Sequence, residues 1–103
     1  MPVSGEISVP PGPDVLKDRA SFWISHTKNF FERTQMVCIH FKNEKSPLYT
    51  CCAYRIDEAM NFLIDAENFY SDKEYKAAYD SAVKALYCLE QIYECYQGNI
   101  FVV

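Results

Sequence analysis

The feature that most constrains this chain is a regular apolar pattern between residues 16 and 41. Apolar residues, together with two threonines, recur there at alternating intervals of four and three, which is the spacing of one face of an α-helix. Asp14 is a suitable N-cap, and the polar segment 42–45 is a suitable end. We therefore expect a first helix over residues 14–41. Its apolar stripe consists of Leu16, Ala20, Trp23, Thr27, Phe30, Thr34, Val37 and Phe41.

Two more helices follow from the same periodicity, over residues 47–70 and 72–97. Ser46 and Pro47 suit the N-cap and the first position of the second helix. Ser71 and Glu74 have the spacing of a capping box at the start of the third. Gly98 is the expected C-terminal stop. The apolar stripe of the second helix consists of Tyr49, Cys52, Ile56, Ala59, Leu63, Ala66 and Tyr70. It is widened on one side by Ala53, Met60 and Ile64 and on the other by Cys51, Phe62 and Phe69. The apolar stripe of the third helix consists of Tyr75, Tyr79, Ala82, Leu86, Leu89, Tyr93 and Tyr96.

These helices predict an all-α fold, an antiparallel up-down-up bundle in a single domain over residues 14–98. The connections are short, so consecutive helices must run in opposite directions. Half of the 103 residues are apolar, which is enough for a core. Residues 1–13 hold four prolines and are expected to form a disordered leader. Residues 99–103 are expected to form a short apolar tail.

Composition narrows the function and the location. The net charge is −4, which disfavours a phosphate-binding surface as the main activity and makes nucleic acid an unlikely partner. No apolar run is long enough to span a bilayer, and no signal-peptide pattern occurs at the N-terminus. We therefore expect a cytoplasmic protein. No Glu-x-x-His pair occurs, so a di-iron carboxylate site is not expected. We also expect no other metal and no cofactor.

Two family resemblances bear on the fold. Residues 59–70, 73–79 and 82–86 resemble a helical hairpin of the tetratricopeptide or microtubule-interacting-and-transport type. A second resemblance lies in residues 27–34, in the segment Ser46–Tyr49, and in Asp65-Ala66 with Phe69. These segments resemble a family of short archaeal proteins known only as a domain of unknown function (the three-five-seven family). This second resemblance covers roughly residues 20–92. It implies a compact helical fold and no assigned chemistry.

Four basic side chains at intervals of seven lie along one edge of the first helix. They are Arg19, His26, Arg33 and His40. The Arg-x6-His spacing resembles that of helical ribonucleases, in which Arg and His act as acid and base. Here Arg19 is followed by Ala20 and Arg33 by Thr34, and both lie on the first helix, so a solvated edge is the favoured interpretation. We expect no enzymatic activity, and a ribonuclease-like or nucleic-acid-associated role is kept as the alternative.

All five cysteines are expected in one half of the bundle. Four of them are expected at a similar distance from the end of the bundle, namely Cys38, Cys51, Cys52 and Cys95. Cys88 is expected in the same half. Three interpretations are open: small buried hydrophobes, a disulfide joining two helices, or a zinc site. A disulfide inside the cell would have precedent in hyperthermophilic archaea, which the family resemblance makes relevant. Zinc is the least favoured, because the ligand spacing fits no standard motif.

Several residues of the first helix fall outside its core stripe. Phe22, Met36 and Ile39 share one side of that helix with His26, Arg33 and His40. Such a set is typical of a contact surface. The favoured function is therefore an interaction module that binds another protein, or a second copy of itself as a homodimer, through the outer face of the first helix.

Overall fold

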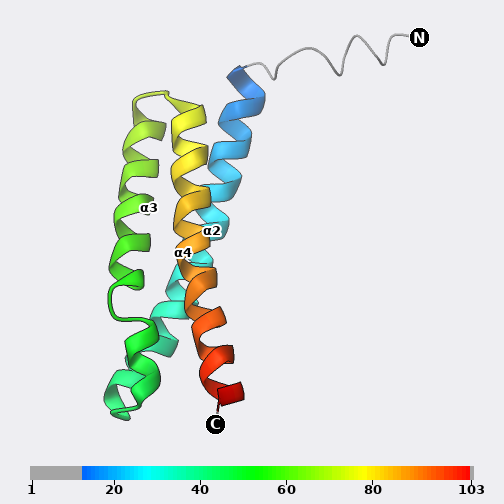
Figure 1. The fold of residues 1–103 in the computed structure, drawn as a ribbon. Helices are drawn as coiled ribbons and strands as arrows, with labels where there is room; N and C mark the ends of the chain where they lie inside the picture. Colours follow the sequence, from blue (N-terminus) through cyan, green and yellow to red (C-terminus); the bar gives the residue numbers. More distant parts are fainter. Residues whose placement is uncertain (1–12, 103) are drawn as a thin grey trace, which may run out of the picture.

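Residues 13–102 form three α-helices and one short 3-10 helix. The computed structural model describes the backbone of residues 13–102 and the side chains of residues 14–98, and this part contains no strand. α2 and α4 run in the same direction, and α3 runs the opposite way between them in the chain (Figure 1). The predicted all-α, up-down-up three-helix fold is confirmed. The elements are α2 (Pro13–Asn43), η1 (Pro47–Cys51), α3 (Arg55–Ser71) and α4 (Tyr75–Val102).

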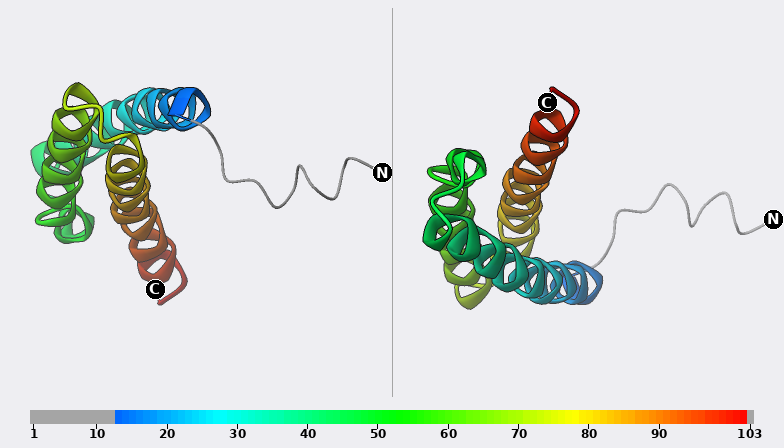
Figure 2. Two further views of the ribbon diagram at one scale, coloured as in Figure 1. Left: turned by 90° about the horizontal axis from the view of Figure 1, so that it is seen from above. Right: turned by 90° about the horizontal axis from the view of Figure 1, so that it is seen from below.

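The three α-helices are tilted against one another, as the views from above and below the bundle show (Figure 2). Their buried side chains form two clusters along the bundle. The cluster at the α3–α4 turn is built mainly from small residues, so the helices approach closely there. The cluster at the other end contains larger side chains and the cysteines. The first consists of Ala20, Ile24, Ala66, Ala78 and Ala82; the second of Phe31, Cys38, Cys51, Cys52, Ala59, Leu63, Ala85, Cys88, Leu89, Ile92 and Tyr96.

Two threonines on the α2 stripe are fully buried, as their position in the pattern predicts. Thr27 and Thr34 each have 0% exposure. The Thr27 hydroxyl donates to the carbonyl of Ala82 at 3.5 Å, and Thr34 Oγ1 lies 3.1 Å from the hydroxyl of Tyr93. Both buried hydroxyls therefore have a partner on α4, which removes the cost of an unsatisfied polar group in the core.

The second helix begins later than the sequence pattern indicates. Ser46 is the N-cap, as expected, and its hydroxyl accepts from the amide of Leu48 at 3.1 Å. It caps the 3-10 helix η1, however, and α3 starts only at Arg55. Residues three apart share a face in both helix types, so the spacing of Tyr49 and Cys52 did not distinguish them.

Both interhelical turns end a helix in the same way. The amides of Ser46 and Glu74 each donate to the carbonyl five residues before them, and Lys45 and Lys73 have φ of 54° and 65°. This is the Schellman motif, with lysine at the left-handed position where glycine is usual. Ser71 is the last residue of α3, so it does not cap α4, and that prediction is wrong.

The ends of the chain differ from the predicted boundaries by a few residues. α2 begins at Pro13, so Asp14 lies in its first turn and is not its N-cap. α4 passes through Gly98 and continues to Val102, because a glycine inside a helix costs only about 1 kcal/mol relative to alanine. The predicted stop at Gly98 is therefore wrong, and the expected tail is helical as far as Val102. The proposed leader lies outside the described residues, except for Pro13.

Candidate functional site

The cysteine-rich end of the bundle is held by two disulfides. Cys38 of α2 is bonded to Cys52, with 5.8 Å between their Cα atoms, and Cys51 of η1 is bonded to Cys95 of α4, with 5.7 Å between theirs. Adjacent residues of one short segment are thus bonded to two different helices. Both Cys51 and Cys52 are buried. η1 ends at Cys51, and the chain turns before α3 begins at Arg55, so these adjacent side chains reach partners on different helices.

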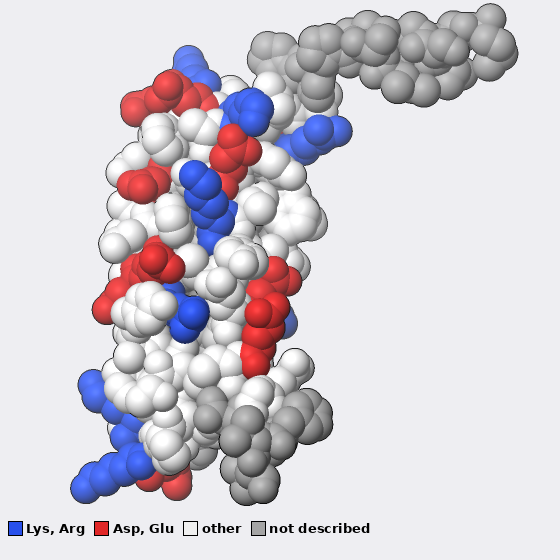
Figure 3. Space-filling model, in the orientation of Figure 1, with Lys and Arg blue, Asp and Glu red and all other residues white. Residues whose placement is uncertain are grey.

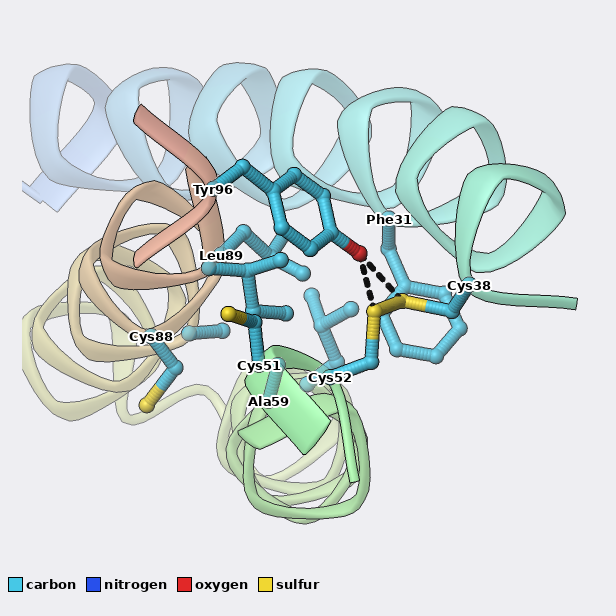
Figure 4. Packing of buried hydrophobic residues seen from close by; sticks show 11 residues of the cluster. Phe31, Cys38, Cys51, Cys52, Ala59, Cys88, Leu89 and Tyr96 are labelled. Carbon is cyan, nitrogen blue, oxygen red and sulfur yellow. Dashed lines mark hydrogen bonds between the residues drawn. A yellow bond between two sulfur atoms is a disulfide. The ribbon is translucent and has the colours of Figure 1, made fainter. Parts of the chain in front are cut away.

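Tyr96 covers one of these disulfides. Its hydroxyl contacts Cys52 Sγ and lies 3.6 Å from Cys38 Sγ (Figure 4). A disulfide sulfur carries no hydrogen, so the hydroxyl is the donor. Burial raises the pKa of Tyr96, and the neighbouring Tyr93 adds to this effect. The hydroxyl therefore stays protonated and keeps its hydrogen bond over a wide range of pH.

Cys88 is the free cysteine of the described structure. Its thiol donates to Glu58 Oε1 across 3.2 Å, and its side chain points away from the disulfides (Figure 4). Burial, followed by the hydrogen bond and the charge of Glu58, raises the pKa of Cys88 to about 11. The thiolate is the reactive form of cysteine. At neutral pH Cys88 is therefore protonated and a poor nucleophile, which does not suit a catalytic or exchange role.

Four of the five cysteines serve as cross-links in this structure. Of the three interpretations open from the sequence, the disulfide is the one observed, although the sequence left the pairing undetermined. All of the cysteines lie in one half of the bundle, as predicted, and they belong to or pack against one cluster. No group of three or more His, Cys, Asp or Glu side chains between residues 14 and 98 is arranged to hold a metal ion.

A groove runs between α2 and α3. Three adjoining hollows form it: Lys28 and Glu67 are shared by the first and second, and Phe31, Gln35 and Met60 by the second and third. On α2 the groove extends from Ser21 to Lys42, a length of about 30 Å at the helical rise. The central hollow has a volume of about 330 Å³. The groove is therefore long enough for another helix.

The middle of this groove is apolar. Phe31 and Leu63 are buried and line it, while Ile39, Met60 and Ile64 line it with exposures of 50%, 41% and 49%. The sequence pattern assigned Met60 and Ile64 to the widened core stripe of the second helix. The structure corrects this assignment, because α2 and α3 do not close over these two side chains.

Polar side chains border the apolar middle. Lys28 Nζ lies 3.2 Å from Glu67 Oε2 and bridges the two helices. Lys42 and Asp57 line the hollow at the other end together with Ile39 and Met60. Neither Lys42 nor Asp57 makes an ion pair within the described residues. The groove thus has the pattern of many protein interfaces, with an apolar centre and a charged border.

The binding set expected from the sequence is divided between two sides of α2. Ile39 faces the groove towards α3, whereas His26 and Arg33 line a hollow towards α4 together with Phe30 and Tyr93. Phe22 stacks on His26 with ring centroids 5.8 Å apart. Phe22, Met36 and Ile39 are exposed as predicted, but the structure does not join them into one surface.

The basic edge of α2 is exposed along its length. Arg19, His26, Arg33 and His40 are all exposed, and none of them is in an ion pair within the described residues. The face over α3 and α4 shows acidic and basic side chains interspersed (Figure 3). Glu90 and Glu94 line a hollow next to Phe30 and Tyr93. Acidic groups therefore lie close to the edge that would have to bind phosphates.

Comparison with known proteins gave no match, whether to family models, to curated proteins or to solved structures. No helix of the described part is long and apolar enough to cross a membrane. The archaeal and hairpin-family resemblances therefore remain predictions from sequence.

Proposed function

We propose that this protein is a non-catalytic interaction module whose α2–α3 groove accepts an amphipathic helix. The observation that carries the proposal is the half-exposed row of Ile39, Met60 and Ile64 above the buried Phe31 and Leu63. Amphipathic helices bind such grooves through apolar side chains at helical spacing. A fourth helix laid in this groove would bury the three aliphatic side chains and extend the bundle.

The two disulfides support this proposal because they make the groove a rigid surface. Cys38 lies on α2 and lines the hollow at the Lys42 end of the groove. Its bond to Cys52 connects α2 to the segment that leads into α3. A preformed surface spends less free energy on ordering when a partner binds. The cross-links thus contribute to binding without taking part in any chemistry.

The disulfides also favour an oxidising environment for the working protein. Such bonds are rare in reducing cytoplasm outside hyperthermophiles. This argument runs against the cytoplasmic location expected from the sequence, and we propose an oxidising compartment in its place. Counting free thiols in protein isolated from its native source and denatured without reductant tests it: one thiol per chain is expected, and five would overturn it.

The groove is tested with a probe helix. The probe is a synthetic fluorescein-labelled amphipathic peptide with leucines at helical spacing, and its fluorescence anisotropy is measured against dilute protein. The variant combines Met60→Lys with Ile64→Lys, and we expect it to bind the peptide at least about tenfold more weakly, because each lysine places a charge in the apolar centre. Tyr87→Lys, on an exposed site of α4, is the matched control. Equal binding by wild type and groove variant would refute the proposal.

The alternative, a nucleic-acid-associated role, rests on the exposed Arg33 and His26 beside the rings of Phe30 and Tyr93. Stacking rings beside an arginine are used by proteins that bind single strands. The net charge and the neighbouring Glu90 and Glu94 make it the less favoured function. A gel shift with single-stranded RNA tests it: a shift that weakens with salt and is lost in Arg33→Ala would favour it over the helix-binding function.

A further inference from the structure

We infer that the helix accepted by the groove is α2 of a second copy of this chain, in a dimer whose two-fold axis runs parallel to the helices. This inference rests on the proposed helix-binding function of the groove. It names the partner of that site and the geometry of the complex.

The charges of the two helices that border the groove are opposite in sign. Among the charged residues that line the groove, α2 contributes Lys28, Lys42 and Glu32, and α3 contributes Asp57 and Glu67. In a two-fold dimer with its axis along the helices, α2 of each chain lies over α3 of the other. Every α2–α3 contact between the chains then joins a basic helix to an acidic one, which favours this pairing over α2 on α2 or α3 on α3.

The heights of individual side chains fit the same arrangement. A rotation about an axis parallel to the helices leaves the height of each residue along the bundle unchanged. Lys28 and Glu67 are at one height, because they form an ion pair within the chain. Lys42 and Asp57 are at another, since both line the same hollow. Each lysine of one chain would therefore face the corresponding acid of its copy.

The apolar residues match at an intermediate height. Ile39 and Met60 line one hollow from α2 and α3 respectively. In the dimer, Ile39 of each chain packs on Met60 of the other, and Ile64 extends the contact. The interface then has two equivalent apolar contacts about the axis, bordered by Lys42–Asp57 pairs. An isologous interface of this kind closes on itself and forms a dimer without further growth.

Sedimentation velocity over a wide range of concentrations tests the partner. Wild type is expected to pass from monomer to dimer as concentration rises. Met60→Lys should remain a monomer, and Tyr87→Lys should dimerise like wild type. A wild-type monomer at every concentration would overturn the second copy as partner, and it would leave the helix-binding function to be judged by the peptide probe. Dimerisation of Met60→Lys equal to that of wild type would also overturn the inference.

A charge-reversal experiment tests the geometry separately. Lys42→Glu and Asp57→Lys each create like charges at both Lys42–Asp57 contacts of a homodimer, so each variant alone should dimerise about tenfold more weakly than wild type. In an equimolar mixture, Glu at 42 in one chain faces Lys at 57 in the other, and Asp57 faces Lys42. The mixture should therefore form heterodimers with an affinity close to that of wild type.

This design separates interface effects from folding effects. Each single variant keeps its like charges within its own chain after mixing, so a defect in the monomer would persist in the mixture. Circular dichroism of each variant provides the check on folding. If wild type dimerises but the mixture associates no better than either variant alone, the two-fold arrangement is wrong while the helix-binding groove stands.

Discussion

Cys51 and Cys52 are neighbours in the chain, but their disulfides connect to α4 and to α2 respectively. The segment that contains these two cysteines is therefore cross-linked to both α2 and α4 at the cysteine-rich end of the bundle. The two bonds close chain segments of different length, with sequence separations of 14 for Cys38–Cys52 and 44 for Cys51–Cys95. This difference gives the two bonds unequal effects on stability.

Removing the longer cross-link is expected to cost more stability than removing the shorter one. The chain-entropy relation gives about 4 kcal/mol for the Cys51–Cys95 loop and about 3 kcal/mol for the Cys38–Cys52 loop. The measurement is the free energy of unfolding in urea for two double-alanine variants, one per disulfide, without reductant. A larger loss for the Cys38–Cys52 variant would contradict the loop-length argument.

Lys45→Gly and Lys73→Gly should each stabilise the protein by about 0.5–1 kcal/mol, because glycine occupies the left-handed region without the steric cost that lysine bears there. The gain is partly offset by the greater freedom of glycine in the unfolded chain. Thermal or urea unfolding measures it. Lys17→Gly, at an exposed position inside α2, is the control and should lose about 1 kcal/mol. Destabilisation by all three changes would contradict this account of the turns.

The part-buried contact between Thr34 and Tyr93 should show coupling in a double-mutant cycle. Thr34→Val or Tyr93→Phe alone leaves a hydroxyl in the bundle without its 3.1 Å partner and should cost about 1–2 kcal/mol. The double variant removes both hydroxyls and should cost clearly less than the sum of the two. Additive losses in urea unfolding would mean that the two hydroxyls do not depend on each other.

The reactivity of Cys88 should depend on pH in a way that reports its burial. Its pKa of about 11 in the folded protein is higher than the ordinary 9.0 of the unfolded chain. The interactions of the protonated thiol therefore stabilise the folded state fully below pH 9, and this contribution is lost as the pH rises from 9 to 11. Alkylation by iodoacetamide should accelerate near pH 9 in denatured protein and near pH 11 in native protein.

Glu58→Gln provides the matched comparison for Cys88. The change removes the charge that faces the thiol and should shift the native alkylation profile to lower pH, although burial alone keeps the pKa raised. Native and denatured wild-type profiles that coincide would contradict the buried, protonated thiol. An unchanged native profile in Glu58→Gln would contradict the part assigned to Glu58.

Some features of the candidate site could be predicted from sequence, and others could not. The exposure of Met36 and Ile39 followed from their angle on α2 relative to the stripe. The exposure of Met60 and Ile64 could not be predicted in this way. Their angular positions on α3 lie next to its core stripe, so the pattern fits a buried side chain as well as an exposed one. The distance between α2 and α3 determines which outcome occurs, and that distance depends on side chains from the whole bundle. Likewise, the helical pattern placed the cysteines at one end, whereas their pairing required the position of η1.

By itself, the sequence determined the number and order of the α-helices and the core faces of α2 and α4, because helical periodicity is local and three strong stripes are separated by short polar turns. It also determined that Ser46 starts a new element, since a cap requires only neighbouring residues. The tertiary structure alone decided which cysteines pair, where the second helix begins and which side of α2 remains open. These features depend on contacts between residues far apart in the chain, and the open groove between α2 and α3 is the one from which the proposed function follows.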